Sequence, residues 1–303
     1  MANIELRGLT KEFRAPAGSG RIRAVDGVDL TVAAGESVAL VGESGSGKST
    51  IARMLVRLEK PTAGSITVDG APVAAQRNLS RRIQMILQDP FSSFNPAHTI
   101  AYSLRRPLEI QFGLAAREAT ERVAGMLHRV GLAPAVNFLE KHANQLSGGQ
   151  RQRANIARAL LLNPEFVVAD EPTSMLDVSV GIGILNLLLD LKESRVSYLF
   201  ITHNLASARY ISERMVVLYK GQVVEEGPTD DVIRRPLHPY TRVLVDATPD
   251  LEKPAVFEGL LEGDAPAAQG CRFAPRCPFR REACREEVAL REAGHRLVRC
   301  VLY

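Results

Sequence analysis

The chain of 303 residues has no hydrophobic run long enough to cross a membrane. Its longest apolar stretch, residues 181–191, is about half the length that a membrane-spanning helix needs. The N-terminus also lacks the apolar core of a secretory signal peptide, because Glu5 and Arg7 interrupt it. We therefore expect a chain that neither spans a membrane nor is secreted, with the cytoplasm as its default compartment.

Cysteine is absent from the first 270 residues, and no internal repeat or low-complexity tract is evident. All four cysteines, Cys271, Cys277, Cys284 and Cys300, lie in the last segment of the chain. The same segment holds eight arginines and four glutamates, which account for the whole net charge of +4. The overall composition, 46% apolar and 24% charged, is that of a globular protein. We expect one large domain followed by a small, chemically separate unit.

Strands and helices are expected to alternate along most of the chain. Apolar patterning predicts strands at residues 4–6, 28–32, 37–41, 64–70, 83–87, 166–169, 198–201 and 215–219, and helices at 51–58, 117–130, 178–193 and 205–212. The first two strands predict a small antiparallel layer, and the interval between the strands at 83–87 and 166–169 predicts a helical insertion. Together these elements predict an α/β fold with a parallel core. Residues 248–270 are typical of a linker.

Residues 42–49 match a phosphate-binding pattern. Their sequence, Gly-Glu-Ser-Gly-Ser-Gly-Lys-Ser, fits G-x-x-x-x-G-K-[ST] and stands between a predicted strand and a predicted helix. The glycines let successive backbone N–H groups surround phosphate oxygens, and the helix N-terminus adds its positive dipole. Lys48 is expected to reach the β and γ phosphates, and Ser49 to ligate Mg²⁺. This pattern alone does not separate kinases, GTPases, helicases and motor ATPases.

Two adjacent carboxylates, Asp170 and Glu171, end the strand predicted at residues 166–169. Successive residues of a strand point to opposite sides, so the two carboxylates serve different purposes. We expect Asp170 to hold Mg²⁺ through water and Glu171 to act as the general base that polarises the attacking water. Without the phosphate-binding pattern, such a pair would instead indicate a solvated turn or a helix cap.

A Leu-Ser-Gly-Gly-Gln sequence at residues 146–150 precedes another helix-compatible run. A Ser-Gly-Gly turn at a helix N-terminus is either a second anion site or a plain helix cap at Ser147. Taken with the two earlier motifs, this sequence resembles the signature of the ATP-binding-cassette (ABC) ATPases over roughly residues 3–235. The resemblance implies a P-loop ATPase cassette with a mixed sheet, an antiparallel β layer, an inserted helical subdomain at about 90–163, and a Cys-containing C-terminal extension at 236–303.

The resemblance also implies roles for further residues. Gln88 matches the glutamine that senses Mg²⁺ and water, and His203 matches the switch histidine that contacts the γ-phosphate. Phe13 stands where the family places an aromatic that stacks on adenine, although it could instead be a core residue. The ATP-binding residues so implied are Phe13, Gly42, Glu43, Ser44, Gly45, Ser46, Gly47, Lys48, Ser49, Thr50, Ser147, Gly148, Gly149, Gln150 and Asp177; catalysis is assigned to Glu171, His203 and Gln88, and Mg²⁺ binding to Ser49, Gln88 and Asp170.

In this family two cassettes pair head to tail, and the signature turn of one closes over the ATP of the other. The single copy of each motif here implies a second ABC ATPase chain, which could be an identical copy or, as in many peptide importers that the chain resembles, a paralogue. Residues 88–96 and the triplet His238-Pro-Tyr240 are similar to those of the ATPase subunits of dipeptide and oligopeptide importers. That similarity implies two permease subunits, an extracytoplasmic solute-binding protein acting indirectly, and a place on the cytoplasmic face of the inner membrane.

Other functions stay open at this point. The same machinery could import an oligosaccharide, nickel or glutathione, and a cassette acting on nucleic acid is a rival from another class. We expect no nucleic acid partner, because the chain lacks the long coiled coils or the second cassette typical of that class. Phe91 and Phe94 could receive a coupling helix of the permease, or could be plain core residues.

The spacing of the four cysteines is not that of a standard zinc ribbon, and a cytosolic location disfavours disulfides. Three alternatives stay open for the four cysteines: a [4Fe-4S] cluster, zinc or no metal. We favour the cluster for Cys271, Cys277, Cys284 and Cys300. Four thiolates with either metal group carry a charge of about −2, which the arginines would offset. The segment is similar to the C-terminal extension of peptide-importer ATPases, which implies an iron-sulfur cluster for some members. His295 is a possible substitute ligand, and the segment could also regulate the ATPase.

Overall fold

The computed structural model describes residues 2–14, 20–90, 92–193, 196–248 and 270–303. These residues form two compact units. The first unit is Met1–Ala2, Ala33–Glu36 and Val73–Leu199, and the second is Asn3–Val32, Ser37–Pro72 and Phe200–Tyr303. The linker expected at residues 248–270 lies almost wholly outside the described residues.

The first unit is mainly helical, as the sequence predicts for the insertion. Its helices are α2 (Leu79–Arg82), α3 (Ile100–Phe112), α4 (Ala116–Arg129), α5 (Val136–Leu139), α6 (Gly148–Leu160) and α7 (Val178–Glu193), with short 3-10 turns at Val73–Ala75 and Ala143–Gln145. Strand β6 (Ile83–Ile86) runs parallel to β7 (Phe166–Asp170), with Ile86 opposite Ala169. All five residues of β7 are buried. Because the strands are parallel, their C-terminal ends lie at the same edge of the sheet.

Helices of the first unit bury one face each. In α4 the buried residues are Ala119, Val123, Met126 and Leu127, which share one side of the helix. Helix α3 begins at the Thr99 cap, whose hydroxyl accepts from the Tyr102 N–H. None of the helices in the described part of the chain is both long and apolar enough to cross a lipid bilayer.

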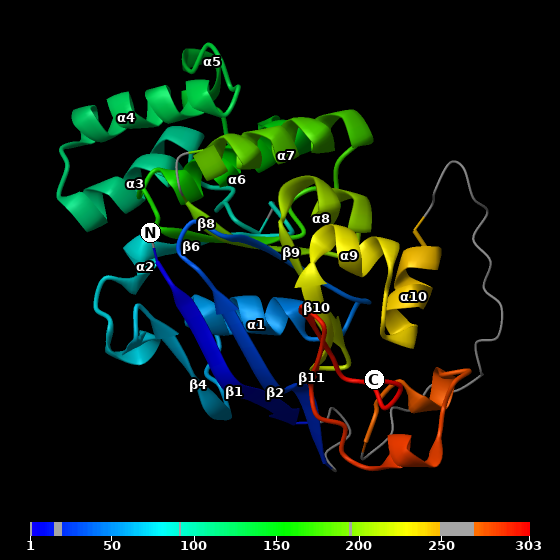
Figure 1. The fold of residues 1–303 in the computed structure, drawn as a ribbon. Helices are drawn as coiled ribbons and strands as arrows, with labels where there is room; N and C mark the ends of the chain where they lie inside the picture. Colours follow the sequence, from blue (N-terminus) through cyan, green and yellow to red (C-terminus); the bar gives the residue numbers. More distant parts are fainter. Residues whose placement is uncertain (1, 15–19, 91, 194–195, 249–269) are drawn as a thin grey trace. The chain divides into compact units, whose positions relative to one another are not determined.

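The second unit contains the antiparallel layer predicted from the N-terminal sequence. Its strands are β1 (Ile4–Arg14), β2 (Arg21–Val32), β4 (Ala63–Val68) and β5 (Ala71–Pro72), in the order β2-β1-β4-β5. Alternate residues of β1 and β2, including Ile4, Leu6, Val28 and Leu30, are buried because one face of this layer packs on the core. Figure 1 shows β1, β2 and β4 side by side.

A second sheet of this unit carries the phosphate-binding sequence. Strand β3 (Ser37–Val41) pairs in parallel with β9 (Arg214–Tyr219), and the antiparallel strands β10 (Gln222–Pro228), β12 (Arg296–Val298) and β11 (Arg291–Ala293) follow in that order. Strand β8 (Ser197–Thr202) begins in the first unit and ends in the second. The helices are α1 (Lys48–Leu55), α8 (Leu205–Ile211), α9 (Thr229–Arg234) and α10 (Pro239–Asp246), with 3-10 turns at Ala274–Arg276 and Glu282–Arg285.

The C-terminal segment is part of the second sheet, because β12 pairs with β10 and places Val298 opposite Glu225. Glu225 is fully buried, and its carboxylate accepts hydrogen bonds from the Leu237 N–H (3.0 Å), the His238 N–H (2.8 Å) and Arg296 Nη1 (3.3 Å). Burial raises the pKa of Glu225 despite these bonds. Residues 270–303 belong to the same compact unit as β9 and β10. A domain boundary near residue 235 stays a prediction.

Candidate functional site

The phosphate-binding loop, residues 42–47, joins β3 to α1, and the matched pattern continues through Lys48 and Ser49 into the helix. Three of its glycines have positive φ angles: 153° at Gly42, 76° at Gly45 and 107° at Gly47. A Cβ atom on Gly42 would lie 2.1 Å from the Leu218 carbonyl oxygen, and one on Gly47 would lie 2.4 Å from that of Ala24. Both contacts are with backbone, so the loop can follow this path only with glycine at these two positions.

Lys48 supplies the positive charge of this loop. The side chain is buried, and its Nζ donates to the carbonyl oxygens of Gly42 (2.7 Å) and Glu43 (2.8 Å). Helix α1 begins at Lys48, and its N-cap Gly47 has no side chain that could cap the first N–H groups. The ammonium and the positive end of the helix dipole therefore belong to the same loop, an arrangement that stabilises bound phosphate groups.

Gln88 and Glu171 meet in the first unit, at the common edge where β6 and β7 end. The Gln88 Nε2 donates to the Glu171 carboxylate at 3.0 Å. Asp170, the residue before Glu171 and the last residue of β7, is buried. Glu171 has a φ of 46°, a left-handed conformation that costs a non-glycine residue about 1–2 kcal/mol. Its carbonyl oxygen accepts from the Ser174 N–H and hydroxyl, which hold this turn.

The signature turn is a capped helix start. Ser147 Oγ accepts from the Gln150 N–H, and Gln150 Oε1 accepts from the Ser147 N–H, so the two residues form a capping box at the beginning of α6. The cap expected as the alternative for Ser147 is therefore present. A Cβ atom on Gly149 would lie 2.6 Å from Val180 Cγ1, because α6 and α7 approach closely there. This contact explains why the turn has glycine at that position.

The other residues predicted to bind ATP lie on loops and strand ends. Asp177 is exposed, and its carbonyl oxygen accepts from the Gly181 N–H at the start of α7. His203 is exposed between β8 and α8. Phe13 on β1 is 38% exposed, and Lys11 Nζ lies 4.9 Å from the centre of its ring. Phe13 is therefore not a core residue, and its ring is accessible for stacking.

Four thiols line one cavity in the second unit. The cavity measures about 10 Å³, and its lining residues are His238, Pro239, Cys271, Ala274, Cys277, Phe279, Cys284, Cys300, Val301 and Leu302. All four cysteines are unpaired by disulfides. Burial, reinforced by the neighbouring thiols, raises the pKa of Cys271 to about 11, and burial also raises the pKa of Cys277 and Cys300. These three thiols are therefore protonated near pH 7 unless a cation replaces the protons.

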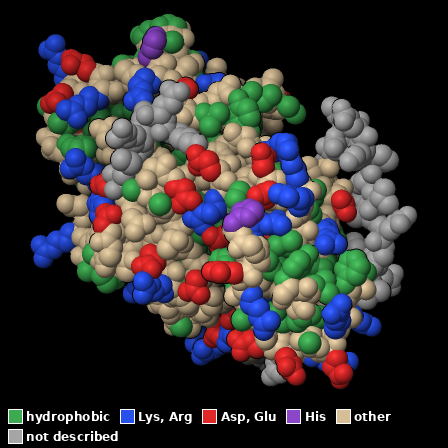
Figure 2. Space-filling view, in the orientation of Figure 1, with side chains coloured by type: hydrophobic (Ala, Val, Ile, Leu, Met, Phe, Trp, Pro, Cys, Tyr) green, Lys and Arg blue, Asp and Glu red, His purple; other side chains and the backbone are tan. Residues whose placement is uncertain are grey.

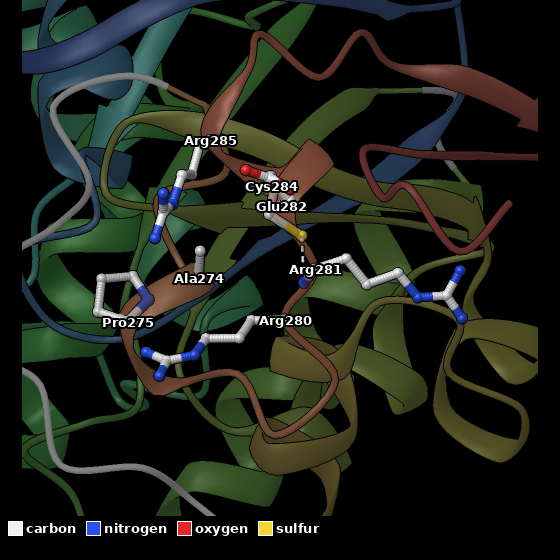
Figure 3. A pocket seen from close by; sticks show the side chains of 7 residues that line it. All are labelled: Ala274, Pro275, Arg280, Arg281, Glu282, Cys284 and Arg285. Atoms are coloured by element: carbon white, nitrogen blue, oxygen red, sulfur yellow. Dashed lines mark hydrogen bonds between the residues drawn. The ribbon is translucent and has the colours of Figure 1, made fainter.

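Arginines surround the outside of this cysteine cavity. A larger hollow of about 640 Å³ beside Cys284 is lined by Arg280, Arg281, Glu282 and Arg285. Figure 3 shows Arg280 and Arg285 extending to one side and Arg281 to the other, while the Arg281 N–H donates to Cys284 Sγ at 3.4 Å. Three of the eight arginines counted in the sequence therefore line the hollow next to Cys284, whereas Arg272, Arg276 and Arg296 pair with carboxylates elsewhere.

Within the described residues, no group of three or more His, Cys, Asp or Glu side chains is arranged to hold a single metal ion. His295, the substitute ligand considered from the sequence, is exposed and pairs with Asp231 Oδ2 at 2.7 Å. The histidine that lines the cysteine cavity is His238, which lies 33 residues before Cys271 in the chain.

Comparison with known proteins gives two matches, one over the phosphate-binding loop and the signature turn and one over part of the cysteine-containing segment. A family model described as "ABC transporter" matches residues 25–174, and one described as "Oligopeptide/dipeptide transporter, C-terminal region" matches residues 224–284. The chain is 42% identical to the di/tripeptide transport ATP-binding protein DppF of Pseudomonas aeruginosa, over 98% of this chain and 96% of that protein. The chain is an ATP-binding protein of the ABC transporter family. A putative peptide import ATP-binding protein of Brucella abortus is 44% identical, over 97% of this ABC protein and 92% of the relative.

This ABC protein is an ATPase, and ATP and Mg²⁺ are the ligands typical of its family. The cassette MJ0796, solved as a dimer in a post-hydrolysis state with ADP and Pi, aligns with a TM-score of 0.68 and 32% identity, covering 75% of this chain and 98% of that chain. The structure of cbiO1 from Clostridium perfringens shares the fold, with a TM-score of 0.65 and 24% identity over 77% and 90% of the two chains. The predicted α/β P-loop cassette fold with its antiparallel layer is confirmed.

Sequence reasoning missed two residues of α6 that fix neighbouring segments of the site, Arg151 before the ABC signature turn and Asn155 before Gln88. Arg151 is buried, and its Nε and Nη2 donate to the carbonyl oxygens of Ala143 (2.8 Å) and Leu146 (3.0 Å). Asn155, one turn further along α6, donates to the Leu87 carbonyl oxygen at 3.3 Å, directly before Gln88. Their spacing of four on one helix face was the available signal.

Of the two phenylalanines considered for a coupling-helix groove, Phe94 is buried, which supports the core interpretation. Arg158 Nη1 donates to the Ser93 carbonyl oxygen beside it, and the Arg158 guanidinium lies 6.0 Å from the Phe94 ring centre. Phe91 lies outside the described residues.

Proposed function

We propose that this chain is the ATP-hydrolysing subunit of an importer for peptides of the dipeptide or oligopeptide type. The observation that carries the proposal is that a complete set of ATPase motifs is joined to a C-terminal region of the oligopeptide/dipeptide transporter type. The relatives named above are peptide transport proteins and match nearly the whole of this chain. The C-terminal region and the relatives both point to a peptide transporter, so they favour transport over the other functions of ABC ATPases.

The proposed roles combine the groups present with the resemblance to the ABC ATPases. Lys48 and the glycine loop would bind the β and γ phosphates, and Ser49, Gln88 and Asp170 would hold Mg²⁺. Glu171 would accept the proton of the attacking water, and the hydrogen bond from Gln88 orients its carboxylate. The resemblance alone assigns adenine stacking to Phe13 and contact with the γ-phosphate to His203.

A second cassette completes the site in this proposal. Ser147 to Gln150 and Asp177 of each chain would contact the ATP bound by the other, in a head-to-tail dimer. The dimer of MJ0796 supports such pairing for this family. We propose a paralogous partner, two permease subunits, an extracytoplasmic solute-binding protein acting through the permease, and attachment to the cytoplasmic face of the inner membrane. ATP binding would close the dimer and hydrolysis would reopen it.

Purification from detergent-solubilised membranes tests this function. The tagged chain is expected to bring with it a second cassette and a polytopic permease, and proteoliposomes of that complex should hydrolyse ATP faster when a dipeptide-loaded binding protein is added. Stimulation by nickel, glutathione or an oligosaccharide instead would show that the transported solute is not a peptide. Retention on nucleic acid at moderate salt without a membrane partner would contradict a transport function. On the face shown in Figure 2, acidic and basic side chains are mixed around the C-terminal segment, which does not favour nucleic acid.

A substitution at Ser147 separates its capping role from its proposed contact with ATP. Ser147→Asp keeps a cap residue but adds a carboxylate that would face the phosphates of the partner's ATP. We expect urea unfolding close to that of the wild type but ATP hydrolysis lowered at least about tenfold. Ser147→Ala serves as the comparison, because it loses about 1 kcal/mol of stability without adding charge. Hydrolysis at the wild-type rate by Ser147→Asp would contradict the proposed contact between the signature turn and ATP.

We further propose that Cys271, Cys277, Cys284 and Cys300 hold a [4Fe-4S] cluster. The four thiols line one cavity, so the fold brings four soft ligands to one place. Four thiolates are the ligand set of a [4Fe-4S] cluster, in which each thiolate binds a different iron. The surrounding arginines also suit a group of negative charge.

Metal analysis of the anaerobically purified chain tests the cluster. We expect a brown protein with about four irons per chain and a broad absorption that Cys284→Ser abolishes or weakens. Chelation of the iron should leave the cysteines accessible to a thiol reagent, which the loaded protein resists. A colourless protein with one zinc per chain would assign the cavity to zinc. A protein that contains neither metal and has four free thiols would show that no metal binds.

A further inference from the structure

The C-terminal segment packs directly behind the phosphate-binding loop. Phe273 and Tyr240 are fully buried in the same core as Val41 of β3, the residue that precedes the loop. The Phe273 ring centre lies 5.6 Å from that of Tyr240 and 5.4 Å from that of Tyr219 on β9. Cys277 belongs to this core as well. The three aromatic rings therefore connect the cysteine cavity to the base of the loop.

Tyr240 bonds the loop itself. Its hydroxyl oxygen accepts from the Glu43 N–H at 2.8 Å. Glu43 is the second residue of the phosphate-binding sequence, so Tyr240 is the hydrogen-bond partner of a backbone N–H of the loop. Burial raises the pKa of Tyr240, so the hydroxyl stays neutral at physiological pH. A neutral, buried acceptor holds a backbone N–H in one orientation, because leaving that N–H unpaired would be costly.

Arg276 bonds the Glu43 side chain. Its Nη1 lies 3.2 Å and 3.4 Å from the two carboxylate oxygens, and the guanidinium lies 5.6 Å from the Phe273 ring centre. Glu43 brings a negative charge into a loop that wraps phosphate groups, and such a charge repels ATP unless it is neutralised. Arg276, the neighbour of Cys277, supplies the neutralising charge from the cysteine segment.

His238 completes the connection. Its Nδ1 accepts from the Tyr240 N–H at 3.0 Å as the cap of α10, and its Nε2 lies 4.0 Å from Cys271 Sγ. The triplet His238-Pro-Tyr240 thus contacts a cysteine at one end and the phosphate-binding loop at the other.

We propose that Arg276 and Tyr240 are positioning residues for the phosphate-binding loop, and that the four-cysteine segment sets the affinity for ATP through their contacts with Glu43. The segment acts as an additional wall of the nucleotide site: its arginine cancels the charge of Glu43, and its packing fixes the tyrosine that orients the Glu43 N–H. The inference concerns ATP binding and is independent of the transported solute and of the metal.

Arg276→Gln tests the electrostatic contact in the full-length chain. We expect the dissociation constant of a nonhydrolysable ATP analogue with Mg²⁺ to rise about two- to fivefold, the effect of losing a partly exposed ion pair, while kcat at saturating ATP changes less than twofold. Because the Glu43 charge causes the loss, Glu43→Gln combined with Arg276→Gln should return the affinity to that of Glu43→Gln alone. Arg280→Gln is the matched control, since that exposed arginine contacts no loop residue in the described structure.

Tyr240→Phe tests the hydroxyl while keeping the aromatic packing. Loss of the acceptor should raise the same dissociation constant about tenfold, with thermal unfolding measured in parallel. Unchanged ATP affinity in both Arg276→Gln and Tyr240→Phe would overturn the proposal. A weakened affinity of Arg276→Gln that the Glu43→Gln change does not rescue would also overturn it, because that result marks general damage to the fold.

Discussion

Replacing Glu171 with glutamine is expected to slow ATP hydrolysis by about a hundred- to ten-thousandfold while ATP still binds. The amide has the shape of the carboxylate, and its oxygen can still accept the hydrogen bond from Gln88 Nε2 that the structure shows at 3.0 Å. The left-handed turn at residue 171 and its bonds to Ser174 involve backbone, so they are retained. The variant loses only the group that takes the proton from water.

Single-turnover release of phosphate measures the effect, and sedimentation with ATP tests whether the variant accumulates as the proposed dimer. Glu140→Gln makes the same chemical change at an exposed position of the first unit and should hydrolyse ATP at the wild-type rate. If Glu171→Gln also hydrolyses ATP at that rate, another residue is the base. If it fails to bind ATP, the carboxylate is needed for the fold of the site rather than for the reaction.

Gly47→Ala is expected to weaken ATP binding severely. The added methyl group would lie 2.4 Å from the Ala24 carbonyl oxygen, and the φ of 107° is one that alanine rarely adopts. The start of α1 contains Lys48, so a shift of the helix away from this contact would displace Lys48 from the loop. Loss of the phosphate cradle and of the helix N-terminus together should weaken ATP binding by at least about a hundredfold.

Gly70→Ala is the matched control for the backbone strain. Gly70 has a φ of 77° in the turn between β4 and β5, and a Cβ atom there meets nothing within 4 Å. It should lower the stability by about 1 kcal/mol and leave nucleotide affinity unchanged, as equilibrium binding and thermal unfolding would show. Normal ATP affinity in Gly47→Ala would mean that the loop adopts a different path from the one described.

The motifs that act through local spacing could be predicted from the sequence. The phosphate-binding loop is a strand, glycines and a helix in immediate succession, and the Ser147 cap involves residues three apart. Strands β1 and β2 could be predicted because alternate residues are buried. Strands β11 and β12, of three residues each, carry too few positions for such a pattern.

Contacts between distant residues could not be predicted in the same way. The resemblance names Gln88 and Glu171 separately, but only parallel pairing of β6 with β7 brings their side chains together. Tyr240 and Arg276 reach Glu43 across 197 and 233 residues. No local pattern marks a tyrosine or an arginine as the partner of a backbone or carboxylate group so far away.

The pairing of β12 with β10 determines where this chain can be shortened. A stop codon after residue 248, where the proline- and glutamate-containing stretch begins, would seem a natural place for a minimal ATPase. Such a truncation would remove β12, one of the two neighbours of β10, and leave the buried Glu225 carboxylate without Arg296. An exposed sheet edge and an uncompensated interior charge favour aggregation, so a shortened version of this chain should retain residues 270–303.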